Sequence, residues 1–284
     1  MKEKQIIVVA GPTASGKSDF AVELALKHKG EIISADSRQV YKGLDIGTGK
    51  ITKAEMKGIP HYMLDVLDAN QEFSVAEYKK IALPILEDIL ARDKTPIICG
   101  GTGQYIDALI FTSEVPKVLP NTTLRKELEA RTVESLYEEL ATKDRRRADM
   151  IDKKNKVRLI RALEVVASLG EVPELTPQKL RYPTTFYLLQ PSRSVSRERT
   201  ERRLLKRIEG GMLEECKKLL TEGADPVWLE KLGLEYRYMS RHLRGEITYE
   251  EFVEILRHKT FQYAKRQDTW NKKYLPIATI VEVK

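Results

Sequence analysis

Eight residues close to the N-terminus have the types and the spacing of a phosphate-binding loop. The pattern is G-x-x-x-x-G-K-[ST], and its members are Gly11, Pro12, Thr13, Ala14, Ser15, Gly16, Lys17 and Ser18. In such a loop, backbone N–H groups and the positive end of a helix dipole face an anion. Lys17 adds a positive charge near the phosphates, and the hydroxyl of Ser18 is placed to bind Mg²⁺. The chain is therefore predicted to bind a di- or triphosphate together with Mg²⁺.

The segments that flank this motif have the periodicity it requires. The β-branched run 6–10 is typical of a buried parallel strand, and residues 19–28 carry apolar side chains at helical spacing. A second predicted strand, 31–37, ends in polar residues. Because ligands bind beyond the carboxyl ends of strands in open α/β sheets, we expect Asp36 and Ser37 beside the phosphate-binding loop.

Strand and helix patterns continue to the C-terminus. Further strands are predicted at 61–66, at 95–103, where the strand runs into a Gly-rich turn, at 184–189 and at 278–283. Helices are predicted at about 75–92, 122–142, 156–169, 196–221 and 248–270, and a further one after the Gly-rich turn through Tyr105, Ile106, Leu109 and Ile110. Ser74 and Glu77 form a predicted capping box, and Pro84 is expected to kink or split the helix that follows. This order favours an α/β fold in which helices flank a parallel sheet that carries the phosphate-binding loop.

Charge and proline content divide the chain. Residues 1–113 hold 14 Lys and Arg against 15 Asp and Glu, whereas the remainder holds 35 against 27. Two prolines between 115 and 120 mark a boundary, and the strand at 184 returns the chain to the sheet. We predict a catalytic core of residues 1–114 and 181–284 with a mainly helical, basic insertion domain at 115–180. The basic half suggests a polyanionic macromolecular partner, with a solvated basic surface as the alternative.

Composition argues against other classes of protein. No apolar run approaches the roughly 20 residues that a membrane span needs. The two cysteines, Cys99 and Cys216, stand far apart and outside any C-x-x-C pair. They are expected to be buried or incidental thiols in a reducing cytoplasm and not part of a zinc site or a disulfide framework.

Several separated motifs resemble those of the tRNA dimethylallyltransferases, also called tRNA isopentenyltransferases. Besides the phosphate-binding loop, they are residues 34–48, 100–106, 158–164 and 263–267, which follow in the family's order and cover nearly the whole chain. The sequence carries no zinc-finger motif, which is similar to bacterial members. It departs from the family pattern at Val157, Leu234 and Asn271, on the side expected to face RNA, so these positions bear on the acceptor and not on the donor.

The resemblance implies transfer of a dimethylallyl group from dimethylallyl diphosphate to the exocyclic amine of the adenosine 3′ of the anticodon in tRNA. The loop amides, Lys17 and Mg²⁺ would stabilise the charge that grows on the leaving diphosphate. Thr13 would donate to the bridging oxygen, and Arg199 would clamp the diphosphate from the other side. Asp36 would orient the amine and take its proton. An Asx-turn role and a water-mediated contact to Mg²⁺ are the alternatives for Asp36.

Other residues are expected to hold the acceptor. Gln pairs bidentately with adenine, so Gln39, with Ser37, is a candidate reader of the base, and Thr102 matches a substrate-contacting threonine of the family. The nucleotide must leave its stack to reach the pocket, while the insertion domain holds the anticodon stem by its phosphates. The predicted RNA-binding residues are Asp36, Ser37, Arg38, Gln39, Thr102, Arg125, Arg158, Arg161, Lys265, Arg266 and Gln267.

Two of these predictions have a structural alternative. Arg161 is also a plausible partner for Glu164 on the same helix, and 265–267 is also explained as the basic end of a capped helix.

Two other enzymatic functions compete with prenyl transfer to tRNA. An adenylate isopentenyltransferase shares the donor site but acts on free AMP or ATP, and a small acceptor needs no extended cationic surface. A small-molecule kinase would use the same phosphate-binding loop, but the strand at 95–100 lacks the terminal Asp that usually binds Mg²⁺. We expect a monomeric cytoplasmic transferase.

Overall fold

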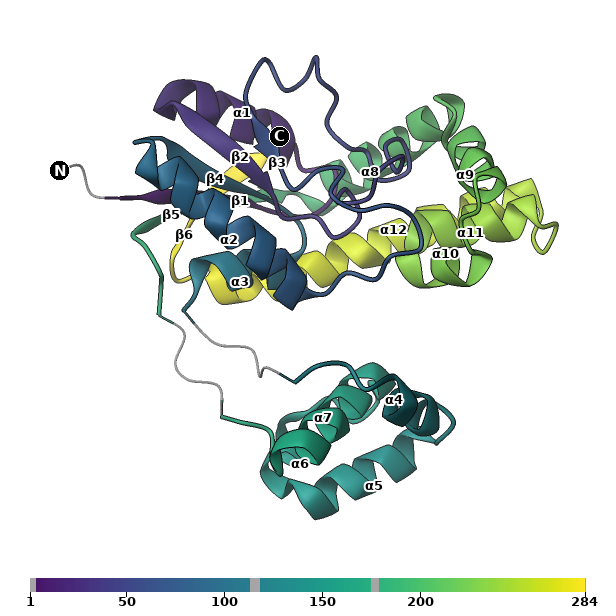
Figure 1. The fold of residues 1–284 in the computed structure, drawn as a ribbon. Helices are drawn as coiled ribbons and strands as arrows, with labels where there is room; N and C mark the ends of the chain where they lie inside the picture. The colour runs from purple at the N-terminus through teal and green to yellow at the C-terminus, as the bar shows by residue number, and fades with distance from the viewer. Residues whose placement is uncertain (1–3, 113–117, 175–178, 284) are drawn as a thin grey trace. The chain divides into compact units, whose positions relative to one another are not determined.

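The computed structural model describes residues 4–112, 118–174 and 179–283. It divides the chain into two compact units, Met1–Thr112 with Leu180–Lys284, and Ser113–Lys179 (Figure 1). In the first unit, the chain leaves and returns at neighbouring points. Phe111 and Leu180 form an antiparallel bridge there, and the N–H of Arg181 donates to the carbonyl of Ile110 at 2.7 Å.

The first unit is built on one parallel sheet of six strands in the order β3-β2-β4-β1-β5-β6. The strands are β1 Ile6–Ala10, β2 Gly30–Ser34, β3 His61–Tyr62, β4 Thr95–Gly100, β5 Thr184–Pro191 and β6 Ala278–Val283. Strand β1 lies between β4 and β5, with Val8 beside Ile98 and Phe186. All residues of β1 are buried, as expected for a central parallel strand covered on both faces.

Helices cover both faces of this sheet. The described helices of this unit are α1 Lys17–His28, α2 Val75–Ala91, α3 Gly103–Ile110, α8 Arg193–Glu209, α9 Met212–Thr221, α10 Pro226–Leu232, α11 Leu234–Leu243 and α12 Tyr249–Asn271, which continues into the short 3₁₀ helix η1 Lys272–Tyr274. Alternate residues of β1 point to opposite faces. Ile7 and Val9 pack with α1, whereas Val8 packs with α2, α3 and η1. Helices α8 to α12 form a further apolar cluster with the loop that contains Val40 and Leu44.

The predicted fold class is confirmed, and some element boundaries are corrected. Helix α2 begins with the predicted capping box at Ser74 and runs unbroken through Pro84, so it is not split. The helix predicted at 196–221 is two helices, because Gly211 adopts φ 96°, a left-handed conformation that ends the helical run. The strand predicted at 61–66 is formed only by His61 and Tyr62.

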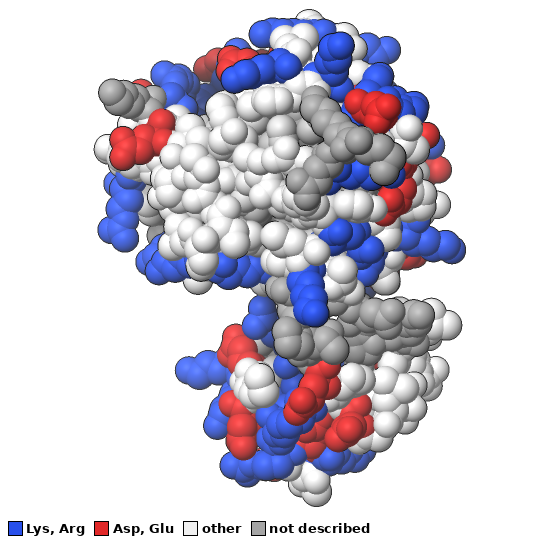
Figure 2. Space-filling view, turned by 90° about the vertical axis from the view of Figure 1, so that its left-hand side faces the viewer, with Lys and Arg blue, Asp and Glu red and all other residues white. Residues whose placement is uncertain are grey.

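The second unit consists of four helices with a core of their own. They are α4 Thr122–Glu129, α5 Val133–Lys143, α6 Arg145–Met150 and α7 Lys156–Leu169. The helix predicted at 122–142 is therefore two helices, α4 and α5. Leu136, Leu140, Leu159 and Leu163 are fully or almost fully buried in this core. On the face shown in Figure 2, positive and negative side chains are interspersed over this unit.

Candidate active site

A cavity of about 1170 Å³ opens in the first unit where β1, β2 and β4 end. The segments that line it include 13–18 of the phosphate-binding loop, 36–39 after β2, 45–46 with 48–52, and the glycine turn 100–101. Helices α8, α11 and α12 complete the lining. Ten Lys or Arg residues line this cavity against five Asp or Glu residues, so it is suited to a polyanionic ligand.

The phosphate-binding loop has the expected geometry. Gly16 adopts φ 85° immediately before α1, which lets the loop turn into the helix. Gly11 is also required, because a Cβ there would lie 2.7 Å from the carbonyl oxygen of Leu189. Gly11 and Pro12 are buried and fall outside the described lining, whereas the other six residues of the motif line the cavity.

Lys17 reaches back over this loop. Its Nζ donates to the carbonyl of Pro12 at 2.5 Å. Burial, which removes hydration from the ammonium, is the main reason that the pKa of Lys17 is lowered to about 8, and the neighbouring Arg203 contributes in the same direction. A bound anion would restore the charge that this environment disfavours.

Ser15 adds a second polar group inside the loop. Its Oγ is buried and has no hydrogen-bond partner among the described residues. Buried hydroxyl groups are normally hydrogen-bonded, so this atom lacks a partner next to the cavity that Ser15 lines.

Asp36 follows β2 and lines the cavity, as predicted. Its Oδ1 accepts the backbone N–H of Arg38 at 2.8 Å and that of Gln39 at 3.3 Å. One carboxylate oxygen therefore makes the Asx-type turn that was the structural alternative for this residue. The negative charge of Asp36 is close enough to Lys17 to raise the pKa of that ammonium, against the larger effect of burial.

Thr102 and Gln39 are also hydrogen-bonded to the protein. The backbone N–H of Ser37 donates to Thr102 Oγ1 at 3.1 Å, so Thr102 holds the segment after β2. The described residues that line the cavity include Ser37, Arg38 and Gln39 but not Thr102. The side-chain amide of Gln39 donates to the carbonyl of Gly49 at 3.3 Å.

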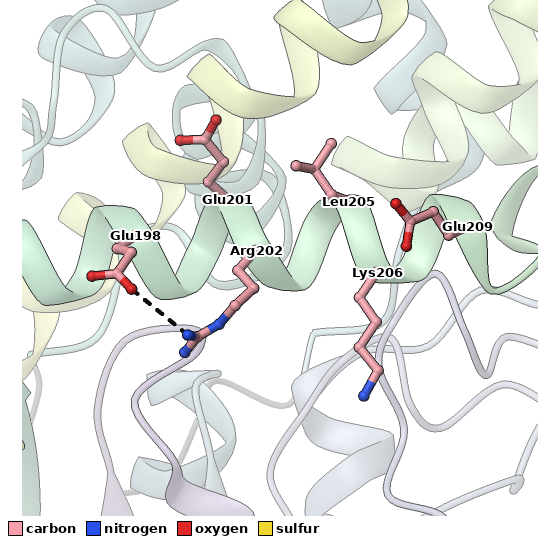
Figure 3. A pocket seen from close by; sticks show the side chains of 6 residues that line it. All are labelled: Glu198, Glu201, Arg202, Leu205, Lys206 and Glu209. Atoms are coloured by element: carbon pink, nitrogen blue, oxygen red, sulfur yellow. Dashed lines mark ion pairs between the residues drawn. The ribbon is translucent and has the colours of Figure 1, made fainter.

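Helix α8 places a row of cations along the cavity. Arg199, Arg202, Arg203, Lys206 and Arg207 recur at helical spacing and all line it. Figure 3 shows the outer side of α8, where Arg202 and Lys206 extend to one side and Glu201 and Leu205 to the other. Arg202 and Lys206 also line the open depression of about 610 Å³ drawn there, and Arg202 pairs with Glu198 at 3.6 Å.

Two arginines of α8 hold the loop at 47–49 by its carbonyl groups. Arg203 donates to the carbonyl of Gly49 at 3.2 Å, and Arg207 donates to that of Thr48 at 3.1 Å. Burial lowers the pKa of Arg203 to about 10, and Arg207 beside it adds to the effect. The cluster of arginines was visible in the sequence, but these contacts were not predicted.

Helix α12 supplies the last wall of the cavity. Tyr263, Arg266 and Gln267 line it, whereas Lys265 is exposed and outside the lining. Gln267 is 8% exposed, and its amide contacts the backbone of both the phosphate-binding loop and the glycine turn. It was predicted to bind RNA, but the structure shows it bound to the protein.

The second unit contains the other three predicted RNA-binding arginines. Arg125 makes two hydrogen bonds of 2.9 Å to Glu164, and Arg161 bonds to the same carboxylate. The side chain of Glu164 is only 1% exposed, so the structural alternative for Arg161 is confirmed, and Arg125 shares that role. Arg158 is exposed.

The structure also bears on the cysteines and on membrane-spanning helices. Cys99 and Cys216 are buried free thiols, as expected. No helix within residues 4–112, 118–174 and 179–283 is both long and apolar enough to cross a membrane.

Comparison with known proteins places the chain in a family. A family model described as IPP transferase matches residues 39–274. The chain is 40% identical to a tRNA dimethylallyltransferase of Pelotomaculum thermopropionicum, covering 97% of this chain and 90% of the relative. It is 41% identical to the enzyme of the same name from Thermoanaerobacter sp. strain X514, covering 95% of this chain and 89% of the relative.

Solved structures give the same result. The tRNA isopentenylpyrophosphate transferase of Bacillus halodurans matches 99% of this chain and 90% of its own, with a TM-score of 0.74 at 35% identity. A eukaryotic dimethylallyltransferase captured acting on tRNA matches 99% of this chain and 74% of its own, with a TM-score of 0.85 at 27% identity. The resemblance seen in the motifs is confirmed: the chain belongs to the tRNA dimethylallyltransferase, or IPP transferase, family.

Proposed function

We propose that this chain transfers a dimethylallyl group from dimethylallyl diphosphate to the exocyclic amine of the adenosine 3′ of the anticodon in tRNA. One observation carries the proposal: the phosphate-binding loop, Asp36 and Arg199 line a single cavity. That cavity joins groups suited to a leaving diphosphate with a carboxylate suited to an amine. The names of the relatives give the reaction class.

On the donor side, breaking the allylic C–O bond builds negative charge on the diphosphate. The loop amides, protonated Lys17, the buried hydroxyl of Ser15 and Arg199 are placed to stabilise that charge as it grows. Thr13, also in the lining, is assigned the bridging oxygen. The electron pair of the broken bond leaves with the diphosphate.

Mg²⁺ fits this cavity as a partner of the diphosphate. Ser18 is exposed to the cavity and offers a hydroxyl ligand. The described residues contain no group of three His, Cys, Asp or Glu side chains that could hold a metal by themselves. Mg²⁺ commonly uses few protein ligands together with substrate phosphates, so Ser18 is the residue we assign to it. When bound, it would act as a Lewis acid on the leaving group.

On the acceptor side, the adenine amine is a weak nucleophile because its lone pair is delocalised into the ring. Since Oδ1 of Asp36 is occupied by the N–H groups of Arg38 and Gln39, we assign Oδ2 to the amine. That oxygen would orient the amine and take its proton as the N–C bond forms. Ser37 and Gln39, next to it in the lining, are assigned to the adenine edge.

The polyanionic partner is tRNA in this proposal. Arg158, exposed on the basic helical unit, is assigned to RNA phosphates, and Arg266 to RNA at the cavity. The enzyme would act as a monomer in the cytoplasm, where its acceptor is processed.

Labelled donor offered to parallel acceptors tests the proposal. The protein is incubated with radiolabelled dimethylallyl diphosphate and Mg²⁺, with bulk unmodified tRNA, AMP or ATP in separate reactions. Label is expected in tRNA. Label in AMP and not in tRNA would make the chain an adenylate isopentenyltransferase. A parallel reaction with γ-labelled ATP tests for a kinase, and phosphoryl transfer without use of the allylic donor would refute the proposal.

A further inference from the structure

We propose that Gln267 is a positioning residue that sets the phosphate-binding loop for the departure of the diphosphate. It would do so by joining the loop to the glycine turn after β4. The inference deepens the proposed function and rests on it for the identity of the leaving group. Gln267 itself touches no reacting atom in this proposal.

The amide of Gln267 is used at both ends. Its Oε1 accepts the backbone N–H of Thr13 at 2.8 Å, and its Nε2 donates to the carbonyl of Gly101 at 3.2 Å. A backbone N–H can only donate and a backbone carbonyl can only accept, so these partners determine which end of the amide is oxygen. The side chain is 8% exposed, so little of it is open to water that could compete for these bonds.

The surroundings are shaped to this side chain. A Cβ on Gly101 would lie 2.2 Å from Nε2 of Gln267, so only glycine leaves room for the amide. This close approach explains why the turn carries glycine at position 101. Both this turn and the loop line the cavity, so Gln267 connects two of its walls.

The contact acts at the point where the loop performs chemistry. Thr13, whose N–H is held, is the residue assigned to the bridging oxygen of the donor. The preceding residue, Pro12, is held through its carbonyl by Nζ of Lys17. The carbonyl and the N–H of the single peptide group between Pro12 and Thr13 are thereby both held, by side chains from α1 and α12. A displacement of about 1 Å in a catalytic group costs rate more than binding, so loss of the contact should lower the rate constant of transfer.

A Gln267→Glu variant distinguishes a positioning role from simple structural support, because its hydrogen bonding changes with pH. When protonated, the introduced carboxyl group offers the same acceptor and donor as the amide. When ionised, it presents an oxygen to the carbonyl of Gly101 and adds a negative charge beside the leaving diphosphate. Single-turnover transfer at neutral pH should fall by about tenfold or more. The ratio of variant to wild-type rate should rise towards one as the pH falls.

Two further variants make this test decisive. Gln262→Glu, the same change elsewhere on α12, should keep a ratio near one at every pH. Gln267→Met has a similar size but neither hydrogen bond, so its ratio should be low and independent of pH. A pH-independent ratio for Gln267→Glu would overturn the proposal. A loss of tRNA affinity at an unchanged single-turnover rate would make Gln267 an RNA contact instead.

A separate measurement distinguishes failure of the role proposed for Gln267 from failure of the proposed function. Binding of inorganic pyrophosphate, measured by calorimetry for the same variants, needs neither prenyl donor nor tRNA. The variant-to-wild-type ratio of pyrophosphate affinities for Gln267→Glu should also rise as the pH falls. If the wild-type protein transfers no prenyl group while this ratio still changes with pH, the positioning role of Gln267 is supported and the proposed reaction is refuted.

Discussion

The carboxylate of Glu215 accepts the backbone N–H of Gly47 at 3.0 Å, although 168 positions separate the two residues. The same carboxylate accepts the N–H groups of Asp45 and Ile46 and the hydroxyl of Tyr236. A loop that lines the cavity is therefore held by its N–H groups from α9 and by its carbonyl groups from α8. Because these contacts use the backbone of the loop, they leave its side chains free to face a ligand in the cavity.

Removing the charge of Glu215 should loosen this loop. In Glu215→Gln, the amide has one acceptor oxygen, and its NH₂ group faces backbone donors. We expect the free energy of unfolding to fall by about 2 kcal/mol, measured by urea denaturation, with slower transfer to tRNA. Glu214→Gln, at the exposed neighbouring position on α9, is the matched control. Equal stability of the two variants would contradict the inferred role of Glu215.

Asp36→Asn should separate the two uses of the Asp36 carboxyl group. The amide oxygen can still accept the N–H groups of Arg38 and Gln39, so the turn should persist. The amide cannot take a proton from the adenine amine, so single-turnover transfer should fall by about 100-fold or more. Pyrophosphate affinity should stay close to that of the wild type. Near-normal transfer by this variant would remove Asp36 as the base.

Arg199→Ala should act on the chemical step. Loss of its guanidinium removes stabilisation from the leaving diphosphate, so single-turnover transfer should slow while tRNA affinity stays unchanged. Arg197→Ala, two positions away on α8 and outside the described cavity lining, should leave both quantities unaltered. Weaker tRNA binding with an unchanged rate would instead place Arg199 on the RNA-binding surface.

The lowered pKa of Lys17 leads to a prediction for how phosphate binding depends on pH. Because the pKa of Lys17 is about 8 in the free protein, the charge that attracts phosphate is present below that pH and is lost above it. Pyrophosphate affinity should fall towards tenfold for each pH unit above about 8. Lys17→Arg keeps its charge over this range, so the ratio of wild-type to variant affinity isolates Lys17 from ionisation of the ligand. A constant ratio between about pH 7 and about pH 9 would show that Lys17 does not titrate there.

Two arginines of the second unit, Arg161 and Arg158, should differ in what their loss affects. Arg161→Ala removes a partner of buried Glu164 and should lower the stability of this unit by about 1 kcal/mol or more. Arg158→Ala should leave stability unchanged while reducing tRNA affinity and lowering the salt dependence of binding by about one phosphate contact. Thermal unfolding and binding titrations at several salt concentrations measure the two effects. The reverse pattern would exchange the roles assigned to these arginines.

Local patterns could be predicted because neighbouring residues determine them. The phosphate-binding loop, the buried strand 6–10 and the capping box of α2 each depend on residue types within a few positions. The resemblance to one family added the order of the motifs, and the fold class followed. Asp36 was placed correctly in the lining because the carboxyl ends of parallel strands share one edge of the sheet.

Contacts between distant segments could not be predicted. Gln267 meets Thr13 across 254 positions, and its sequence context of basic residues suggested RNA instead. Glu215 stands among ordinary exposed charges of an amphipathic helix, with no pattern that marks its three backbone partners. The break at Gly211 also depends on tertiary packing, since a glycine within a helical pattern is often tolerated. In each case the missing information was which surface of the fold the side chain meets.

The bridge between Phe111 and Leu180 bears on how such enzymes diversify. Where the chain leaves the first unit and comes back, its two arms are already fastened together, and the guanidinium of Arg181 reinforces them through the carbonyls of Leu109 and Phe111. A segment inserted between Phe111 and Leu180 therefore does not have to hold the two ends together. The entropic cost of closing the loop also grows only slowly with the length of the insertion. Under the proposed function, replacing the unit between these arms would change the choice of acceptor without moving the residues assigned to the leaving diphosphate.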